Sequence, residues 1–157
     1  LPMIRLTAIA FAAVMAASGA HAQDMEVIKN GTRDGMLGSP DLFTGTVYVE
    51  PVFSNREPFV VSSGKVTFLP GARSNWHTHP AGQMLIVTEG TGWVQQEGKD
   101  KQVMQPGDVV WCPPGVKHWH GATDATAVTH YAVQQFEDGE AVVWMEPVTD
   151  EQFGASE

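Results

Sequence analysis

The chain has 157 residues and carries 9 basic and 18 acidic side chains, which gives a formal net charge of −9 at pH 7. Because nucleic acids and anionic membranes are polyanions, this balance argues against both as partners. The single cysteine, Cys112, excludes a disulfide within this sequence. It ends the apolar run Val109–Cys112, so we interpret it as a small buried hydrophobic residue and not as a nucleophile.

Residues 1–22 have the three-part composition of a secretion signal peptide. Arg5 gives a positive start, Leu6–Ala17 is apolar, and Ala20-His21-Ala22 fits the rule of small residues flanking a cleavage site. The apolar run is too short to span a bilayer comfortably. We therefore expect cleavage after Ala22 and a mature protein that is periplasmic or secreted.

After this leader, residues 23–42 are polar and rich in glycine, and they are predicted to form an irregular N-terminal arm. Residues 43–153 are predicted to form one all-β domain, because short runs of Val, Thr, Ile and aromatic residues alternate with Pro-Gly and acidic-Gly turn signals. The predicted strands are 46–49, 59–62, 65–69, 84–88, 92–96, 101–104, 109–112, 125–135 and 141–144, followed by a short helical turn near 150–153. Many short strands at close spacing indicate a sandwich or a barrel.

The histidines beyond the leader are concentrated in a pattern typical of a metal site. His77 and His79 stand at i and i+2, so they share one face of a strand, and Gln83 follows closely. His118 and His120 repeat the spacing on a later strand. Neutral imidazoles with an amide oxygen suit Mn, Fe, Co, Ni, Cu or Zn, and four protein ligands leave open positions for chemistry. The alternative is a cluster of barrel-lining histidines that holds no metal.

Two motifs resemble those of the cupin family. Gly71-x5-His77-x-His79-x3-Gln83-x6-Gly90 resembles the first cupin motif, with Gln where Glu is usual, and Gly107-x5-Pro113-x-Gly115-x2-His118 resembles the second. The resemblance implies a single-domain cupin jelly-roll barrel, the double-stranded β-helix.

The local sequence narrows the resemblance to the small bacterial manganese-dependent cupin hydroxynitrile lyases. The similarity extends over nearly the whole domain, including the stretches 41–47, 70–73, 76–80, 82–83, 85–88, 107–111, 117–122, 129–130 and 144–152. It implies His77, His79, Gln83 and His118 as metal ligands, and His120 and His130 as the catalytic histidines near the substrate. Manganese is the implied ion, with Fe, Zn, Ni and Co as alternatives.

The implied reaction is the reversible cleavage of an aromatic cyanohydrin into an aldehyde and cyanide, with the metal as a Lewis acid and a histidine as the general base. Gln83 favours this chemistry, because a neutral amide leaves the ion more positive than a carboxylate does and disfavours the higher oxidation states of oxygen activation. Two alternatives are a quercetinase-like dioxygenase and a non-catalytic periplasmic cupin that binds metal or a small ligand.

Three further expectations concern the barrel wall and its assembly. The tryptophans at 76, 111 and 119 are interpreted as wall and core residues. Arg73 could pair with an acid, and we interpret it as a solvated residue of the barrel rim. We expect a homodimer, in which the strand Thr46–Val49 adds to the edge of a partner's sheet.

Overall fold

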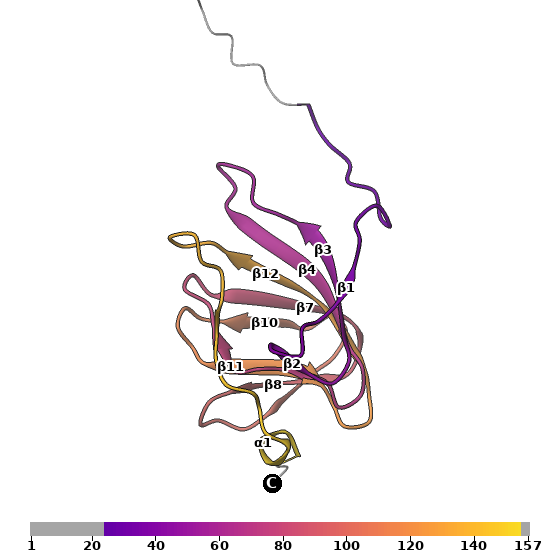
Figure 1. Cartoon of the computed structure of the whole chain (residues 1–157), viewed down its shortest axis with the longest axis vertical. Coiled ribbons are helices and arrows are strands. Elements are labelled where there is room, and N and C mark those ends of the chain that lie inside the picture. Colours follow the sequence, from indigo (N-terminus) through magenta and orange to yellow (C-terminus); the bar gives the residue numbers. More distant parts are fainter. Residues whose placement is uncertain (1–23, 155–157) are drawn as a thin grey trace, which may run out of the picture.

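Two curled β-sheets enclose the core of the protein (Figure 1). The computed structural model describes residues 24–154, so the predicted leader, residues 1–22, lies outside the described residues. Within residues 24–154, no helix has both the length and the apolar character needed to cross a membrane.

The first sheet has six strands, all antiparallel to their neighbours. Its spatial order is β1 (Met36–Leu37), β3 (Val47–Phe53), β4 (Val61–Phe68), β12 (Val128–Gln135), β7 (Gln83–Gly90) and β10 (Val109–Cys112). The central position of β12, between β4 and β7, brings together strands that are distant in sequence.

The second sheet is arranged around β11 (His118–Ala122), which pairs with three different strands. Its order is β13 (Val143–Trp144), β6 (His77–Thr78), β11, β5 (Arg73–Ser74) and β2 (Phe43–Thr44), and β8 (Gly92–Gln96) joins β11 to β9 (Gln102–Met104). Gly121 allows β11 to lie close to β5, since a Cβ atom there would stand 2.4 Å from the carbonyl oxygen of Ala72. A short helix, α1 (Asp150–Gly154), follows the last strand.

The core lies between the sheets and receives apolar side chains from both. Strand β12 shows the alternation that produces it, because His130 and Ala132 point inward while Tyr131 and Val133 are only partly buried. The main cluster consists of Val47, Val66, Phe68, Ala72, Leu85, Val87, Val94, Met104, Ala122, Val128 and Ala132. In a second cluster, Phe153 of α1 packs with Trp76, Trp119 and Val148.

The predicted all-β barrel is confirmed, and strands 92–96 and 109–112 have the predicted bounds. The predicted strands 59–62 and 65–69 are one continuous strand, β4, because Gly64 pairs with Pro51 and Ala132 in place of forming a turn. The short strand β5 was not predicted, whereas β6 and β11 were absent from the strands predicted by composition but agree with the strand geometry expected from the i, i+2 histidines. The arm predicted to be irregular also contains β1.

Two predictions about the barrel wall are wrong. Trp111 is 59% exposed on the outer face of β10, although Trp76 and Trp119 are buried as expected. Arg73 is buried and not solvated at the rim. Its guanidinium donates to the carbonyl oxygen of Val148 at 2.8 Å and to Asp150 at 2.6 Å, so it fastens the C-terminal segment to β5.

The homodimer stays a prediction, but β1 replaces Thr46–Val49 as the edge strand that could pair with a partner subunit. Thr46–Val49 is not at a sheet edge, because β1 pairs with β3 on that side. The N–H of Gly38 donates to Val47 O at 2.8 Å, and successive N–H groups point to opposite sides of a strand. The N–H of Leu37, whose side chain is 71% exposed, therefore faces away from the sheet.

We expect sedimentation velocity at micromolar concentration to show a dimer that pairs through β1. Replacing Leu37 by Pro removes an outward N–H donor and should weaken the dimer, whereas Leu37→Thr keeps the donor and should not. A wild-type protein that sediments only as a monomer would contradict this prediction.

Candidate metal centre

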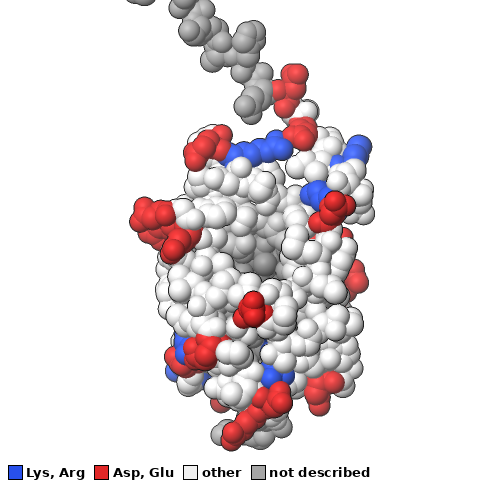
Figure 2. All heavy atoms as spheres, viewed as in Figure 1, with Lys and Arg blue, Asp and Glu red and all other residues white. Residues whose placement is uncertain are grey.

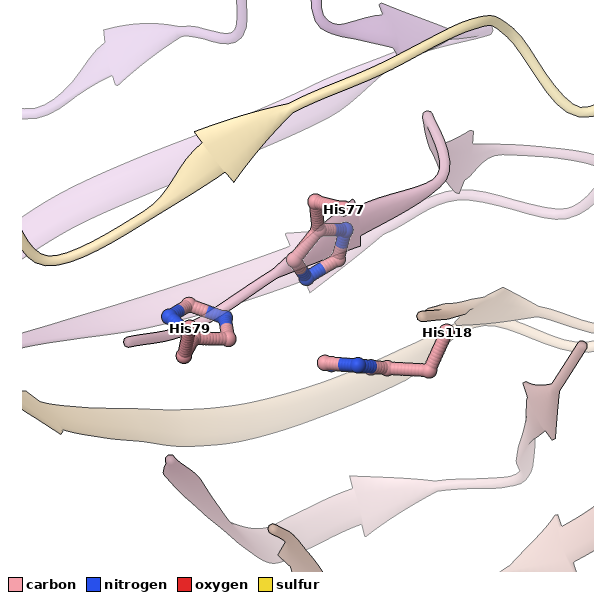
Figure 3. A group of neighbouring side chains, drawn as sticks. All are labelled: His77, His79 and His118. Atoms are coloured by element: carbon pink, nitrogen blue, oxygen red, sulfur yellow. The ribbon is translucent and has the colours of Figure 1, made fainter. Parts of the chain in front are cut away.

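Three imidazoles from separate positions of the second sheet meet inside the barrel (Figure 3). His77 lies in β6, His79 follows that strand, and His118 begins β11, where it is the direct cross-strand partner of His77. One ring nitrogen of each lies within 4.8 Å of the others. All three side chains are buried, so the nitrogens face a site that is largely shielded from bulk water.

Each of these imidazoles is oriented by a backbone carbonyl. The Nδ1 atoms of His77, His79 and His118 lie 2.8, 2.6 and 2.8 Å from the carbonyl oxygens of Asn75, Ala141 and Val116, respectively. A carbonyl oxygen can only accept, so each Nδ1 carries the proton. The Nε2 atoms are then left with free lone pairs, which is the form of histidine that binds a metal.

Gln83 completes the group from the first residue of β7. A turn from His79 to Gly82, with the Gly82 N–H donating to His79 O at 3.2 Å, brings it there, and the φ of +83° at Gly82 suits only glycine without strain. Gln83 is buried, and its Oε1 lies 3.4 Å from His118 Nε2. These two atoms both accept and have no proton between them, so a cation would relieve their repulsion.

An orphaned nitrogen gives a second test of the fit to a metal. Within residues 24–154, only two fully buried side-chain nitrogen or oxygen atoms lack a hydrogen-bond partner, and one of them is His79 Nε2. A buried acceptor without a partner is costly unless something binds it. Three imidazole nitrogens and one amide oxygen therefore fit a divalent transition metal ion, and His77, His79, His118 and Gln83 are the residues that would hold it.

The cluster is electrically neutral without a metal. Burial lowers the pKa of His77 well below its usual value of 6.5, lowers that of His118, and lowers that of His79 to about 4. Among the described residues, Arg73 is the only buried side chain with a permanent charge. An ion bound here would keep its full positive charge, because no carboxylate compensates it.

The two remaining histidines form a pair beside the cluster. His120 Nδ1 and His130 Nε2 lie 3.0 Å apart, which joins β11 of one sheet to β12 of the other. The ring of His120 is the nearer to the ligands, with its centroid 5.2 Å from that of His77. Burial lowers the pKa of His120 well below its usual value and that of His130 to about 4, so both imidazoles are neutral near pH 7.

The structure thus brings all six predicted site residues together, and it adds others that the sequence analysis did not identify. The ring of Trp144 packs against His77 at a centroid distance of 4.9 Å. Gln134 accepts a hydrogen bond from the amide of Gln83. The inward alternation of β12 from His130 through Ala132 to Gln134 was the signal that could have identified Gln134. Cys112 is buried and its pKa is raised to about 11 by burial, which agrees with an inert residue.

Known proteins match the chain in both sequence and structure. The family described as Cupin domain matches residues 64–133. An (R)-mandelonitrile lyase from Granulicella tundricola is 54% identical over 129 residues, which cover 82% of this chain and 98% of that protein.

Solved structures of cupin proteins are also similar to this chain. A cupin-like protein from Thermotoga maritima is 37% identical, with a TM-score of 0.71 over 82% of this chain and 95% of that chain. A cupin-2 domain from Rhodospirillum rubrum is 16% identical, with a TM-score of 0.63 over 83% of this chain and 85% of that one, and it supports the fold alone.

The depressed pKa of His130 predicts how the stability of the metal-free protein depends on pH. The unfolded chain, with an ordinary histidine pKa of 6.5, takes up a proton before the folded one, whose pKa is about 4. The contribution of His130 to the free energy of unfolding is therefore complete above pH 6.5. It is lost as the pH falls toward 4, which lowers the free energy of unfolding by up to about 3 kcal/mol.

Urea unfolding in EDTA between pH 8 and 4.5 measures this effect. His130→Gln should lose less stability than the wild type over the same range, because glutamine does not titrate. Parallel stability curves for the two proteins would show that His130 does not contribute in this way.

Proposed function

Since this chain belongs to the cupin family, we propose that it is a metal-dependent lyase that cleaves and forms aromatic cyanohydrins. One observation carries the proposal: the four predicted ligands present neutral nitrogen and oxygen donors to one point, with a hydrogen-bonded pair of neutral histidines beside it. The 54% identity to an (R)-mandelonitrile lyase supports this reaction and the choice of an aromatic substrate.

A bound divalent ion, Mn²⁺ in our proposal, would supply a Lewis acid for the hydroxyl oxygen of the cyanohydrin. His120 then accepts the hydroxyl proton, because it is the neutral imidazole that lies next to the ligand cluster. In the tautomer that leaves His120 Nε2 free, its Nδ1–H donates to His130 Nε2, so His130 orients the base and stabilises its charged form. His120 and His130 thus form one proton-handling unit.

The reaction balances without an oxidant or a reductant. As the hydroxyl proton leaves, the carbon–oxygen bond becomes the aldehyde carbonyl, and the bond to the nitrile carbon breaks. Cyanide departs with that electron pair and takes the proton back from the imidazolium, giving hydrogen cyanide. The low pKa of His120 suits this return, since a buried imidazolium is a strong proton donor.

The surface gives a second, weaker argument for a small neutral substrate. Figure 2 shows a hollow in the face of the molecule, bordered mainly by uncharged atoms, with one acidic side chain just below it and most other charged side chains nearer the outline. An aromatic nitrile carries no charge, and an apolar concave site with a few converging polar groups is the usual kind of small-molecule site.

The test is cleavage of racemic mandelonitrile by the manganese-loaded protein under anaerobic conditions. Replacing either His120 or His130 by Ala should lower kcat about 10²–10⁴-fold, the usual contribution of a positioned acid–base group, while the metal content is unchanged. His118→Ala should lose metal and activity together. Gln83→Glu should reduce cleavage, because a carboxylate neutralises part of the charge on the ion.

Metal analysis of each variant is the control that separates loss of the ion from loss of the base. A protein that leaves mandelonitrile intact but consumes oxygen with a flavonol would replace the lyase by the dioxygenase. A metal-loaded protein that does neither would indicate a binding protein.

A further inference from the structure

The amide of Gln83 is held from behind by a chain of polar side chains across three strands. Gln83 Nε2 donates to Gln134 Oε1 at 3.2 Å, and Gln134 Nε2 donates to Ser62 Oγ at 2.8 Å. Gln134 in β12 is the direct cross-strand partner of both Gln83 in β7 and Ser62 in β4. Their side chains therefore stand next to one another on the inner face of the sheet.

The donor and acceptor order of these side-chain hydrogen bonds matters, because the oxygen and the NH₂ group of an amide are chemically different. Only the carbonyl oxygen of Gln83 can bind a cation, whereas its NH₂ group repels one. His118 Nε2 is a free acceptor 3.4 Å from Gln83 Oε1, so it would attract the NH₂ group in place of that oxygen if the amide were free to rotate. The acceptor Gln134 Oε1 opposes this rotation, since it occupies the NH₂ group on the side away from the cluster.

We propose that Gln134, supported by Ser62, is a positioning residue that fixes the Gln83 amide with its oxygen toward the metal centre. The inference rests on the proposed function only in assuming that a divalent metal is bound at this site. Gln134 acts through Gln83 and contacts none of the three histidines of the cluster by hydrogen bond.

Two features of the fold make Gln134 suited to this role. Strand β12 is central in its sheet and is paired along its whole length with β4, so its backbone is held in a fixed register. The bulge between Thr129 and His130 lies at the far end of the pairing with β7, and the register from His130 to Gln134 is continuous. A side chain on this strand is therefore a firm support for an amide on its neighbour.

The experiment measures the binding of Co²⁺ to the metal-stripped protein by calorimetry and records the visible absorption spectrum of the complex. Gln134→Met keeps the side-chain volume but removes the acceptor, so Co²⁺ affinity should fall about 10–100-fold, as is usual for a lost partner of a metal ligand. The matched control is Gln135→Met, one residue along β12 on the exposed face, which should bind Co²⁺ as the wild type does. Gln134→Glu keeps an acceptor and should retain the affinity.

A double-mutant cycle tests whether Gln134 acts through Gln83. Gln83→Met removes the amide ligand, so adding Gln134→Met to it should change neither the Co²⁺ affinity nor the spectrum further. Equal losses in both backgrounds, or a Gln134→Glu protein that binds as weakly as Gln134→Met, would overturn the proposal. Thermal unfolding in EDTA identifies a variant that has merely lost its fold.

The same experiment keeps the two proposals separate. If the wild type fails to cleave mandelonitrile but the cycle shows coupling in Co²⁺ binding, the lyase function is wrong and the role of Gln134 stands. If cleavage is found but no coupling, the role of Gln134 is wrong and the lyase function stands.

Discussion

Three N–H to carbonyl hydrogen bonds decide what the interior of this barrel can do. Each fixes one imidazole of the cluster in the tautomer that directs a bare Nε2 toward its neighbours. The barrel must then accommodate several lone pairs that repel one another and lack proton donors, which is unfavourable without a cation. This repulsion does not separate the side chains, because the closely paired strands around them restrict their movement.

Hydrogen-bond partners also divide the five histidines into two groups. His77, His79 and His118 use their second nitrogen on the backbone, so they cannot exchange protons without losing their orientation. His120 and His130 instead use theirs on each other, and a bond between two imidazoles can carry a proton in either direction. The five histidines thus fall into two groups with different hydrogen-bond partners, and this difference is the basis of the two roles that we propose for them.

The sequence predicted the barrel from its short strands and turns, and it predicted six residues of the candidate site from histidine spacing together with the resemblance to the cupin lyases. Alternating strands gave the barrel, and two imidazoles at i and i+2 necessarily share a face. The pairing of His120 with His130 could not be predicted, since it depends on how the two sheets approach each other across the core. Arg73 was misjudged for a similar reason, because its acceptor is a backbone carbonyl 75 residues away.

Local sequence does carry part of the orienting network. His77 and His118 both donate to the carbonyl two residues earlier, at Asn75 and Val116, so the same short-range geometry recurs on two strands. His79 differs, because its acceptor Ala141 is 62 residues distant and cannot be identified from spacing.

The remote acceptor of His79 has a consequence for how the sequence can vary. Ala141 follows a tight hairpin in which Glu137 and Glu140 exchange backbone hydrogen bonds around Asp138 and Gly139, both with positive φ. Exposed hairpins of this kind ordinarily tolerate insertions and deletions, both in evolution and in engineered proteins. Here a change in the length of the hairpin would displace the Ala141 carbonyl and release the ring of His79. The length of this loop is therefore constrained by the metal centre. In a library of loop variants, those that keep the length should retain the orientation of His79, whatever residues they contain.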